Sequence, residues 1–529
     1  MTRLRFLDIL IVILTISILN TGCGKSEEPV SDILAEIDSL EKKLEWADYR
    51  LSEEEWEHFR TGKSDSLSFY NDLYLYVIAG TNLYKYAKNG SNLTDKTDRQ
   101  RLQILISEIV TDRIEFQPEM SEFKRGLKSI VDSFKVDFQG EETSLKDVKE
   151  LYYDSRNRSQ RELGCRAWYS IGENLAPGVY KLIRARNETA SRLGYDNYWD
   201  LVSSQFSQNG VDILAFIKSI DSLTQSPYTQ YKDNARTSLG VNQLELWDIP
   251  FTHSQINRQG DSFFPIDSQF TFVRRGLTSV GFSLEQLPIY IEDITRADSD
   301  FESRSFAVSP PHDIRILNRV QNGFAGMHSL LNQTGISLYS AYIAQERPLY
   351  NYAADTTWQM AMGEIISAMA NDSAWLYDVA SMPVGFISQF KQAKIEQELI
   401  IIRELLANIN FIYEAHINPD RDLNLLYWEL YQKFTGLPRH EDMIIWSTVP
   451  ELTSDPMLLV RKLAAKTIAA QSVNYMTTYF GPLINNHNTS SFLVQNYFRF
   501  GSRYAWSELL QRGTGEKLNP IHLKKFLEF

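Results

Sequence analysis

Residues 305–328, SFAVSPPHDIRILNRVQNGFAGMH, decide how the rest of the chain is interpreted. The passage 304–308 reads as a short strand, and Pro310-Pro311 ends it because proline has no backbone N–H to donate to a sheet. Apolar residues recur at helical spacing over residues 320–331. The stretch therefore predicts a small β element followed by a helix that carries His328.

Most of the remaining chain is helical by its pattern. A second strand-like passage covers residues 289–294, and residues 243–265, with Pro250 and Pro265, lack a helical period and are interpreted as loop. No repeat or low-complexity linker divides the chain, which predicts one large, mostly α unit. Further helices are predicted over residues 31–49, 70–86, 101–114, 146–163, 167–193, 358–370, 387–413, 423–434 and 458–479.

Composition excludes some classes of function. The chain has 529 residues, of which 43% are hydrophobic, and its 28 Phe, 27 Tyr and 10 Trp are enough for a large core. Its net charge is −13, and no basic run interleaved with aromatic residues occurs. Because binding to nucleic-acid phosphates needs a basic face, we expect no nucleic-acid partner.

The N-terminus has the layout of a bacterial export signal. Arg3 and Arg5 precede a short apolar run over residues 9–19, which as a helix rises only about 16 Å and is too short to span a bilayer. Asn20-Thr21-Gly22-Cys23 then resembles a lipobox, in which the cysteine becomes the lipidated first residue. We expect a signal peptide over 1–22, lipidated Cys23 with a short tether over 23–30, and a folded domain over 31–529. The alternative is an ordinary cleaved signal with an incidental cysteine.

These features predict a protein of the bacterial cell envelope, anchored to a membrane by its lipid and facing the periplasm or the cell exterior. Cys165 has no disulfide partner once Cys23 carries lipid. Its helical setting favours a buried apolar side chain over a nucleophile.

Four stretches, in order along the chain, resemble the angiotensin-converting-enzyme family of zinc peptidases and the related oligoendopeptidase and thimet oligopeptidase family. They are LIRARNETASRLGYDNYWDL (182–201), SFAVSPPHDIRI (305–316), PDRDLNLLYWELYQKFTG (419–436) and GSRYAWSELLQRGTGEKLNPIHLKKFLEF (501–529). The resemblance implies a gluzincin-peptidase-like helical domain of two lobes around a deep central groove. It also implies a zinc site on the helix that follows Pro310-Pro311.

The zinc motif itself has been replaced. The family has H-E-x-x-H on this helix, with two histidine ligands and a glutamate base, and a third ligand, Glu, on the next helix. Here Phe324 stands at the first histidine, Ala325 at the base, and only the second histidine survives, as His328. Met360 falls at the third ligand, and Glu364 keeps an acid at the supporting position.

The residues that stabilise the family's transition state also differ. The family has a histidine and two tyrosines around a phrase like HVPxxxPYxRY. In this chain Thr448, Met457 and Val460 fall at those positions. The resemblance therefore implies that hydrogen bonds to a developing oxyanion are missing as well.

These replacements remove the chemistry that zinc needs. Phe324 and Ala325 have no metal donor, a Met thioether is too soft for Zn²⁺, and one imidazole cannot replace three protein ligands. No H-E-x-x-H motif, serine elbow or phosphate loop occurs elsewhere in the chain. We expect no cofactor, an apolar repacked site, and His328 as a hydrogen-bonded remnant.

Three hypotheses of function follow. The first is an inactive metallopeptidase homologue (a pseudopeptidase) that binds a peptide or protein in the inherited groove. The second is a structural or assembly lipoprotein whose groove is filled. The third is an active metallopeptidase with an atypical site, which would act as a peptidyl-dipeptidase or oligopeptidase.

Overall fold

A computed structural model describes residues 29–63, 66–86, 91–115, 117–295, 302–352 and 355–527. The predicted signal peptide and Cys23 lie outside the described residues. The predicted tether, residues 23–30, is described only at its end, where Val30 already begins the first described helix.

The N-terminal part is a set of helices followed by a small hairpin. The predicted helix at 31–49 is confirmed but continues to Thr61, because Trp56 extends its buried stripe after Ile33, Ile37, Leu40 and Leu44. The elements are α2 (Val30–Thr61), α3 (Leu67–Ala79), α5 (Lys96–Glu115), α6 (Pro118–Ser133), β1 (Val136–Phe138) and β2 (Glu141–Thr143).

The next helices begin and end differently from the prediction. Instead of one helix over 146–163 there are two, because the side chain of Asn157 accepts hydrogen bonds from the N–H groups of Ser159 and Gln160 and starts a new helix. The helix predicted at 167–193 begins at Gly172 and contains Pro177. The elements are α7 (Leu145–Asp154), α8 (Arg158–Tyr169), α9 (Gly172–Arg192), α10 (Tyr198–Gln208) and α11 (Ile213–Leu239).

The interpretation of residues 243–265 as loop is wrong in part. They contain two 3₁₀ turns, Leu246–Asp248 and Pro250–His253, and the short helix α12 (Ser254–Asp261). Ile256 is the one large apolar residue of α12, so its helical period could not show in the sequence.

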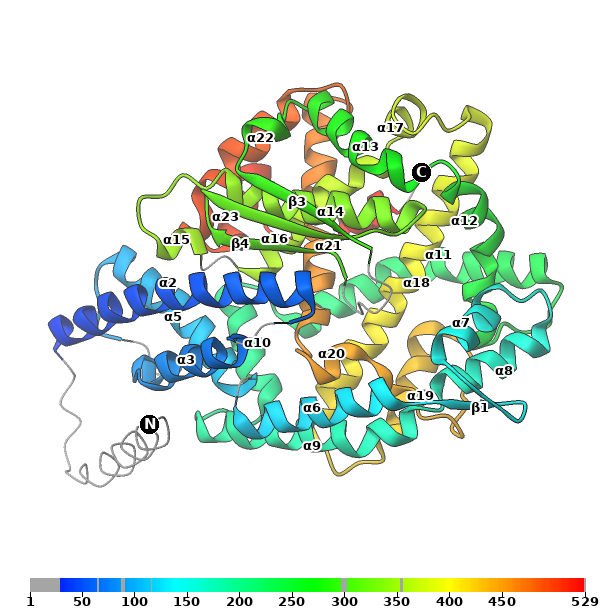
Figure 1. Cartoon of the computed structure of the whole chain (residues 1–529), viewed down its shortest axis with the longest axis horizontal. Helices are drawn as coiled ribbons and strands as arrows, with labels where there is room; N and C mark the ends of the chain where they lie inside the picture. The colour runs from blue at the N-terminus through cyan, green and yellow to red at the C-terminus, as the bar shows by residue number, and fades with distance from the viewer. Residues whose placement is uncertain are drawn as a thin grey trace.

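A three-stranded sheet precedes the helix that carries His328. Strands β3 (Ile289–Ile294) and β4 (Arg304–Ser309) agree with the prediction, whereas β5 (Asp313–Arg319) was not predicted. The order is β3-β5-β4, with β5 parallel to β3 and antiparallel to β4. One long helix, α2, packs against β4, where Trp56 meets Phe306 with ring centroids 5.5 Å apart (Figure 1).

The C-terminal half carries the helices around the predicted site. Helices α18 and α21 run through the middle of the molecule, and α6 and α9 pack side by side at its lower edge (Figure 1). The elements are α13 (Ile266–Ser279), α14 (Phe324–Ala341), α15 (Leu349–Tyr352), α16 (Thr356–Ser367), α17 (Ser373–Asp378), α18 (Val384–Ile417), α19 (Leu423–Thr435), α20 (Pro450–Thr453), α21 (Leu458–Phe480), α22 (Asn488–Asn496), α23 (Trp506–Thr514) and α24 (Ile521–Phe526).

Helices α14 and α16 cross at very short range because glycine stands at the contact on both. A Cβ added to Gly335 would lie 2.6 Å from the carbonyl oxygen of Met362. One added to Gly363 would lie 2.8 Å from Oδ1 of Asn332. Only residues without a side chain allow this approach, and it fixes the distance between the two helices that carry His328 and Met360.

The fold is therefore mostly α with a small β element before α14, as predicted. One continuous hydrophobic core links the helices, and a small separate cluster joins α2 to the sheet. Within the described ranges, no helix is long and apolar enough to cross a membrane.

Candidate functional site

Phe324, Ala325 and His328 lie in the first turns of α14, and Met360 lies on α16, the helix that packs against α14. Phe324 is buried, Ala325 is exposed, and His328 and Met360 are half-buried. Ala325 and His328 belong to a stripe along α14 that solvent reaches and that continues through residues 329, 332, 333 and 336. The expectation of a fully repacked core is correct for Phe324 only.

Phe324 is held by aromatic contacts and by a helix cap. Its ring centroid lies 5.4 Å from that of Phe264 and 5.3 Å from that of Phe390, both edge to face. Its backbone N–H donates to Oδ1 of Asp261 at 2.8 Å, which satisfies the first turn of α14. A phenyl ring therefore occupies the position where the resemblance places a zinc ligand.

A lysine from α18 covers this ring. Nζ of Lys394 lies 4.6 Å from the centroid of Phe324 and donates to Oδ1 of Asn257 at 2.9 Å and Oε1 of Gln397 at 3.1 Å. Burial lowers the pKa of Lys394 to about 8, against the opposing effect of Asp261.

A second lysine, Lys466 of α21, joins three helices. Its Nζ lies 2.8 Å from Oε1 of Glu398 on α18 and 3.4 Å from Oε2 of Glu364 on α16. Burial opposes the charge of the ammonium, but the two carboxylates outweigh burial and raise the pKa of Lys466. The acid that the resemblance assigns to metal support is thus paired with an ammonium group.

His328 faces this cluster without a hydrogen bond to any described residue. Its ring packs against Phe324 with centroids 5.7 Å apart. Burial lowers the pKa of His328, and the charge of Glu364 opposes that shift. The prediction of a hydrogen-bonded remnant is wrong: His328 is a half-buried imidazole whose polar atoms remain available.

The side chains at this crossing do not fit a zinc ion. Phe324, Ala325 and Met360 supply no ligand suited to Zn²⁺, and Lys466 already pairs with the nearby acids. In the part of the chain that the structure describes, no three His, Cys, Asp or Glu side chains are grouped so that they could hold a metal ion.

Thr448 ends the 3₁₀ turn Trp446–Thr448, and Met457 and Val460 lie at the start of α21. Met457 and Val460 are buried in the core, and the half-buried hydroxyl of Thr448 donates to the carbonyl of Ile445 at 2.7 Å. Their assignment to the oxyanion-binding positions stays a prediction. Asp455 and Arg461, from the same segment, instead face a cavity.

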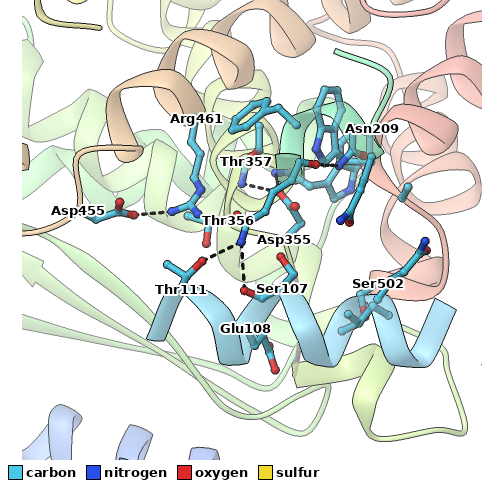
Figure 2. A pocket seen from close by; sticks show the side chains of 18 of the residues that line it. Ser107, Glu108, Thr111, Asn209, Asp355, Thr356, Thr357, Asp455, Arg461 and Ser502 are labelled. Carbon is cyan, nitrogen blue, oxygen red and sulfur yellow. Dashed lines mark hydrogen bonds and ion pairs between the residues drawn. The ribbon is translucent and has the colours of Figure 1, made fainter. Parts of the chain in front are cut away.

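That cavity has a volume of about 660 Å³. Figure 2 shows side chains from α5, α10, α16 and α21 around it, with Arg461 paired to Asp455 at 2.5 Å. The wall combines apolar, neutral polar and charged side chains, and within it Nε2 of Gln205 donates to Oγ1 of Thr111 at 2.9 Å. Thr356 lines the cavity one helical turn before Met360, so the cavity adjoins the α14–α16 crossing.

Trp358 also lines this cavity and carries an unused donor. The side chain is 1% exposed, and its indole N–H donates to none of the described residues. A buried N–H without a partner is uncommon in folded proteins, because it loses its hydrogen bond to water.

Sequence reasoning missed Lys394, Lys466, Glu398 and the cavity. One signal was present for Lys466, which is the only charged residue over 463–480 in an otherwise apolar or neutral helix. Its partners stand far away in the sequence, so the sequence alone did not reveal the pairing.

Comparison with known proteins defines the class of fold. No protein-family profile matches the sequence, and no curated protein sequence matches it either. Among solved structures, "PZ peptidase A with inhibitor 2" matches with a TM-score of 0.67 and 12% identity, over 96% of this chain and 98% of that one. The chain therefore has a metallopeptidase-like fold. This likeness supports the peptidase fold in general and does not single out the angiotensin-converting-enzyme family.

Proposed function

We propose that this chain is an inactive metallopeptidase homologue that binds a peptide or protein along the surface beside its former zinc position. The observation that carries the proposal is the set of side chains at the α14–α16 crossing. Phenyl, methyl and thioether groups stand where two ligands and a base are expected, and the ammonium group of Lys466 pairs with Glu364 and Glu398.

Binding is favoured over a filled groove because the site remains open to solvent. Ala325 is exposed, His328 and Met360 are half-buried, and the adjoining cavity is within the range of volumes that hold small ligands. Amide and hydroxyl side chains in the cavity wall, among them Gln205, Thr111 and Ser107, can form hydrogen bonds with the carbonyl and amide groups of a peptide backbone.

The first experiment measures metal content and hydrolysis on the purified full-length protein. We expect far less than one zinc per chain by elemental analysis and no cleavage of a quenched-fluorescent peptide mixture, with or without added zinc. One tightly bound zinc per chain, with hydrolysis that a chelator abolishes, would support the active-enzyme hypothesis instead.

The second experiment measures binding of a random hexapeptide mixture by native mass spectrometry. Thr356→Trp places a large ring at the cavity wall and should remove binding, whereas Val384→Trp, at a position 70% exposed, should not. If the unaltered protein retains no peptide, the structural lipoprotein with a filled groove becomes the better hypothesis.

We also propose export and lipid anchoring at Cys23, supported by the order of basic, apolar and small residues before it. Metabolic labelling with an alkyne fatty acid should mark the protein in membranes. Cys23→Ser should lose the label and Cys165→Ser should keep it, since Cys165 is buried in the fold. Label retained by Cys23→Ser would exclude this anchor.

A further inference from the structure

Around the replaced zinc position lie apolar side chains, one imidazole and two ammonium groups, which together could not bind zinc. Ala325 is exposed on α14, and Met360 is half-buried on α16, the helix that packs against α14, so both apolar side chains are reached by solvent. The imidazole of His328 packs against the Phe324 ring and makes no hydrogen bond to the described residues. Two ammonium groups lie around it, each already engaged by protein acceptors.

We propose that the former zinc site has become a subsite for one apolar side chain of the bound peptide, with His328 holding the adjacent backbone. This inference rests on the proposed peptide binding and adds a preference for a residue such as Leu, Met or Phe. The thioether of Met360 is flexible and polarizable, so it adapts to aliphatic and aromatic shapes alike.

The charges around the proposed subsite favour a neutral side chain. Lys466 lies between Glu364 and Glu398, whose two negative charges exceed its single positive charge, so an acidic ligand group would be repelled by carboxylates already in place. A basic ligand group would meet Lys394, which lies 4.6 Å from the Phe324 ring. An apolar group needs neither charge and gains from leaving water.

His328 can serve the peptide backbone in either tautomer. Burial lowers its pKa, so the ring stays neutral and offers one N–H donor and one acceptor. A peptide unit offers the complementary carbonyl and N–H. The peptide carbonyl can therefore accept from the imidazole N–H, the peptide N–H can donate to the other ring nitrogen, or both bonds can form.

The distance to the cavity fits one extended ligand. Thr356 at the cavity, Met360 at the proposed subsite and Glu364 beyond it follow one another at intervals of one helical turn along α16. From Thr356 to Glu364 the helix rises about 12 Å, which an extended peptide spans in about four residues. A single peptide could therefore fill both the cavity and the apolar subsite.

The test uses nonapeptides of Gly and Ser with one variable central residue. A large central side chain is the only one in its peptide, so it determines which residue of the peptide occupies the subsite. Binding to the full-length protein is measured by fluorescence anisotropy. We expect peptides with Leu, Met or Phe to bind about tenfold or more tightly than those with Asp, Lys or Gly, the effect of burying one apolar side chain.

Two variants locate the preference. Met360→Gln should reduce it severalfold, and Ala325→Asp, at an exposed position that folding does not depend on, should abolish it. Asn322→Asp is the matched control, because it adds the same charge at an exposed position just before α14 and should leave the preference unchanged. His328→Leu should weaken all peptides alike.

The outcomes separate the two proposals. If neither these peptides nor the random hexapeptide mixture binds, the proposed function fails. If peptides bind but show no preference for an apolar centre, or if Ala325→Asp keeps that preference, the subsite inference is overturned while peptide binding stands.

Discussion

Replacing Lys466 by methionine should destabilise the protein in a way that depends on pH. The substitution keeps most of the side-chain volume and removes only the ammonium group. Glu364 and Glu398 are then left facing each other without their shared cation. Both acids are less than a quarter exposed, so water screens the pair only partly.

The distances give the magnitude. The ammonium nitrogen lies 2.8 Å from one carboxylate oxygen and 3.4 Å from the other, so these two oxygens are at most about 6 Å apart. Two like charges at this distance repel by about 3 kcal/mol at an effective dielectric constant of about 20. At pH 8 we expect Lys466→Met to lower the free energy of unfolding by about 3 kcal/mol. At pH 5 we expect a smaller loss, because protonation of one carboxyl relieves the repulsion.

Urea denaturation followed by circular dichroism at pH 5 and pH 8 measures both values. Adding Glu398→Gln to Lys466→Met should recover most of the loss at pH 8, because it removes one of the opposed charges. The matched control is Lys462→Met, one turn earlier on α21. The ammonium group of Lys462 is more exposed than that of Lys466, so its pair with Glu451 at 2.5 Å should contribute at most about 1 kcal/mol. A loss below about 1 kcal/mol for Lys466→Met, or the same loss at both pH values, would refute this electrostatic reasoning.

Three further predictions concern the same fold. Phe324→His, Ala325→Glu and Met360→Glu together should restore about one zinc per chain by elemental analysis, and a folded triple variant without zinc would show that the assigned register is wrong. Burial raises the pKa of Glu404 from 4.5 to about 7, so its stability contribution is full below about pH 4.5 and lost as the pH rises through 7. Glu404→Gln should therefore stabilise the protein at pH 8, raising the free energy of unfolding by up to about 3 kcal/mol and with it the melting temperature, but should not do so at pH 4.5. Equal increases in melting temperature at both pH values would contradict this. Burial raises the pKa of the Cys165 thiol to about 12, so a thiol reagent at pH 8 should modify it in urea but not in the native protein, and rapid native labelling would count against its burial.

Local patterns in the sequence predicted which segments are helical better than they predicted where each helix begins and ends. The apolar period of α2 was visible, but Trp56, which extends the helix toward the sheet, matters only through its contact with Phe306. Asn157 caps the start of α8, a signal that the prediction of one helix over 146–163 did not use. Strand β5 showed polar Asp313 and Arg315 alternating with apolar residues, a pattern concealed by the expectation that helices resume at once.

The site could be predicted only where one segment carries it. The positions of Phe324, Ala325 and His328 follow from their spacing on a single helix, and Met360 lies on α16, which packs against it. The assignment of Met360 to the third-ligand position stays a prediction. The electrostatic half of the site could not be predicted, because Lys466 meets Glu364 and Glu398 from three different helices. Half-exposure of His328 likewise depends on the packing of the surrounding helices.

The glycine contact between α14 and α16 bears on how such a site is lost. In proteins where a metal ion holds the chain together, removing the ligands unfolds the structure. Here Gly335 and Gly363 let the backbones themselves set the spacing of the two helices, without help from a bound ion. The packing of these two helices therefore does not depend on a metal ion. Under the proposed function, substitutions at Phe324, Ala325 and Met360 could accumulate with little cost to folding, and the peptidase-like fold could bind a peptide with the same helix spacing.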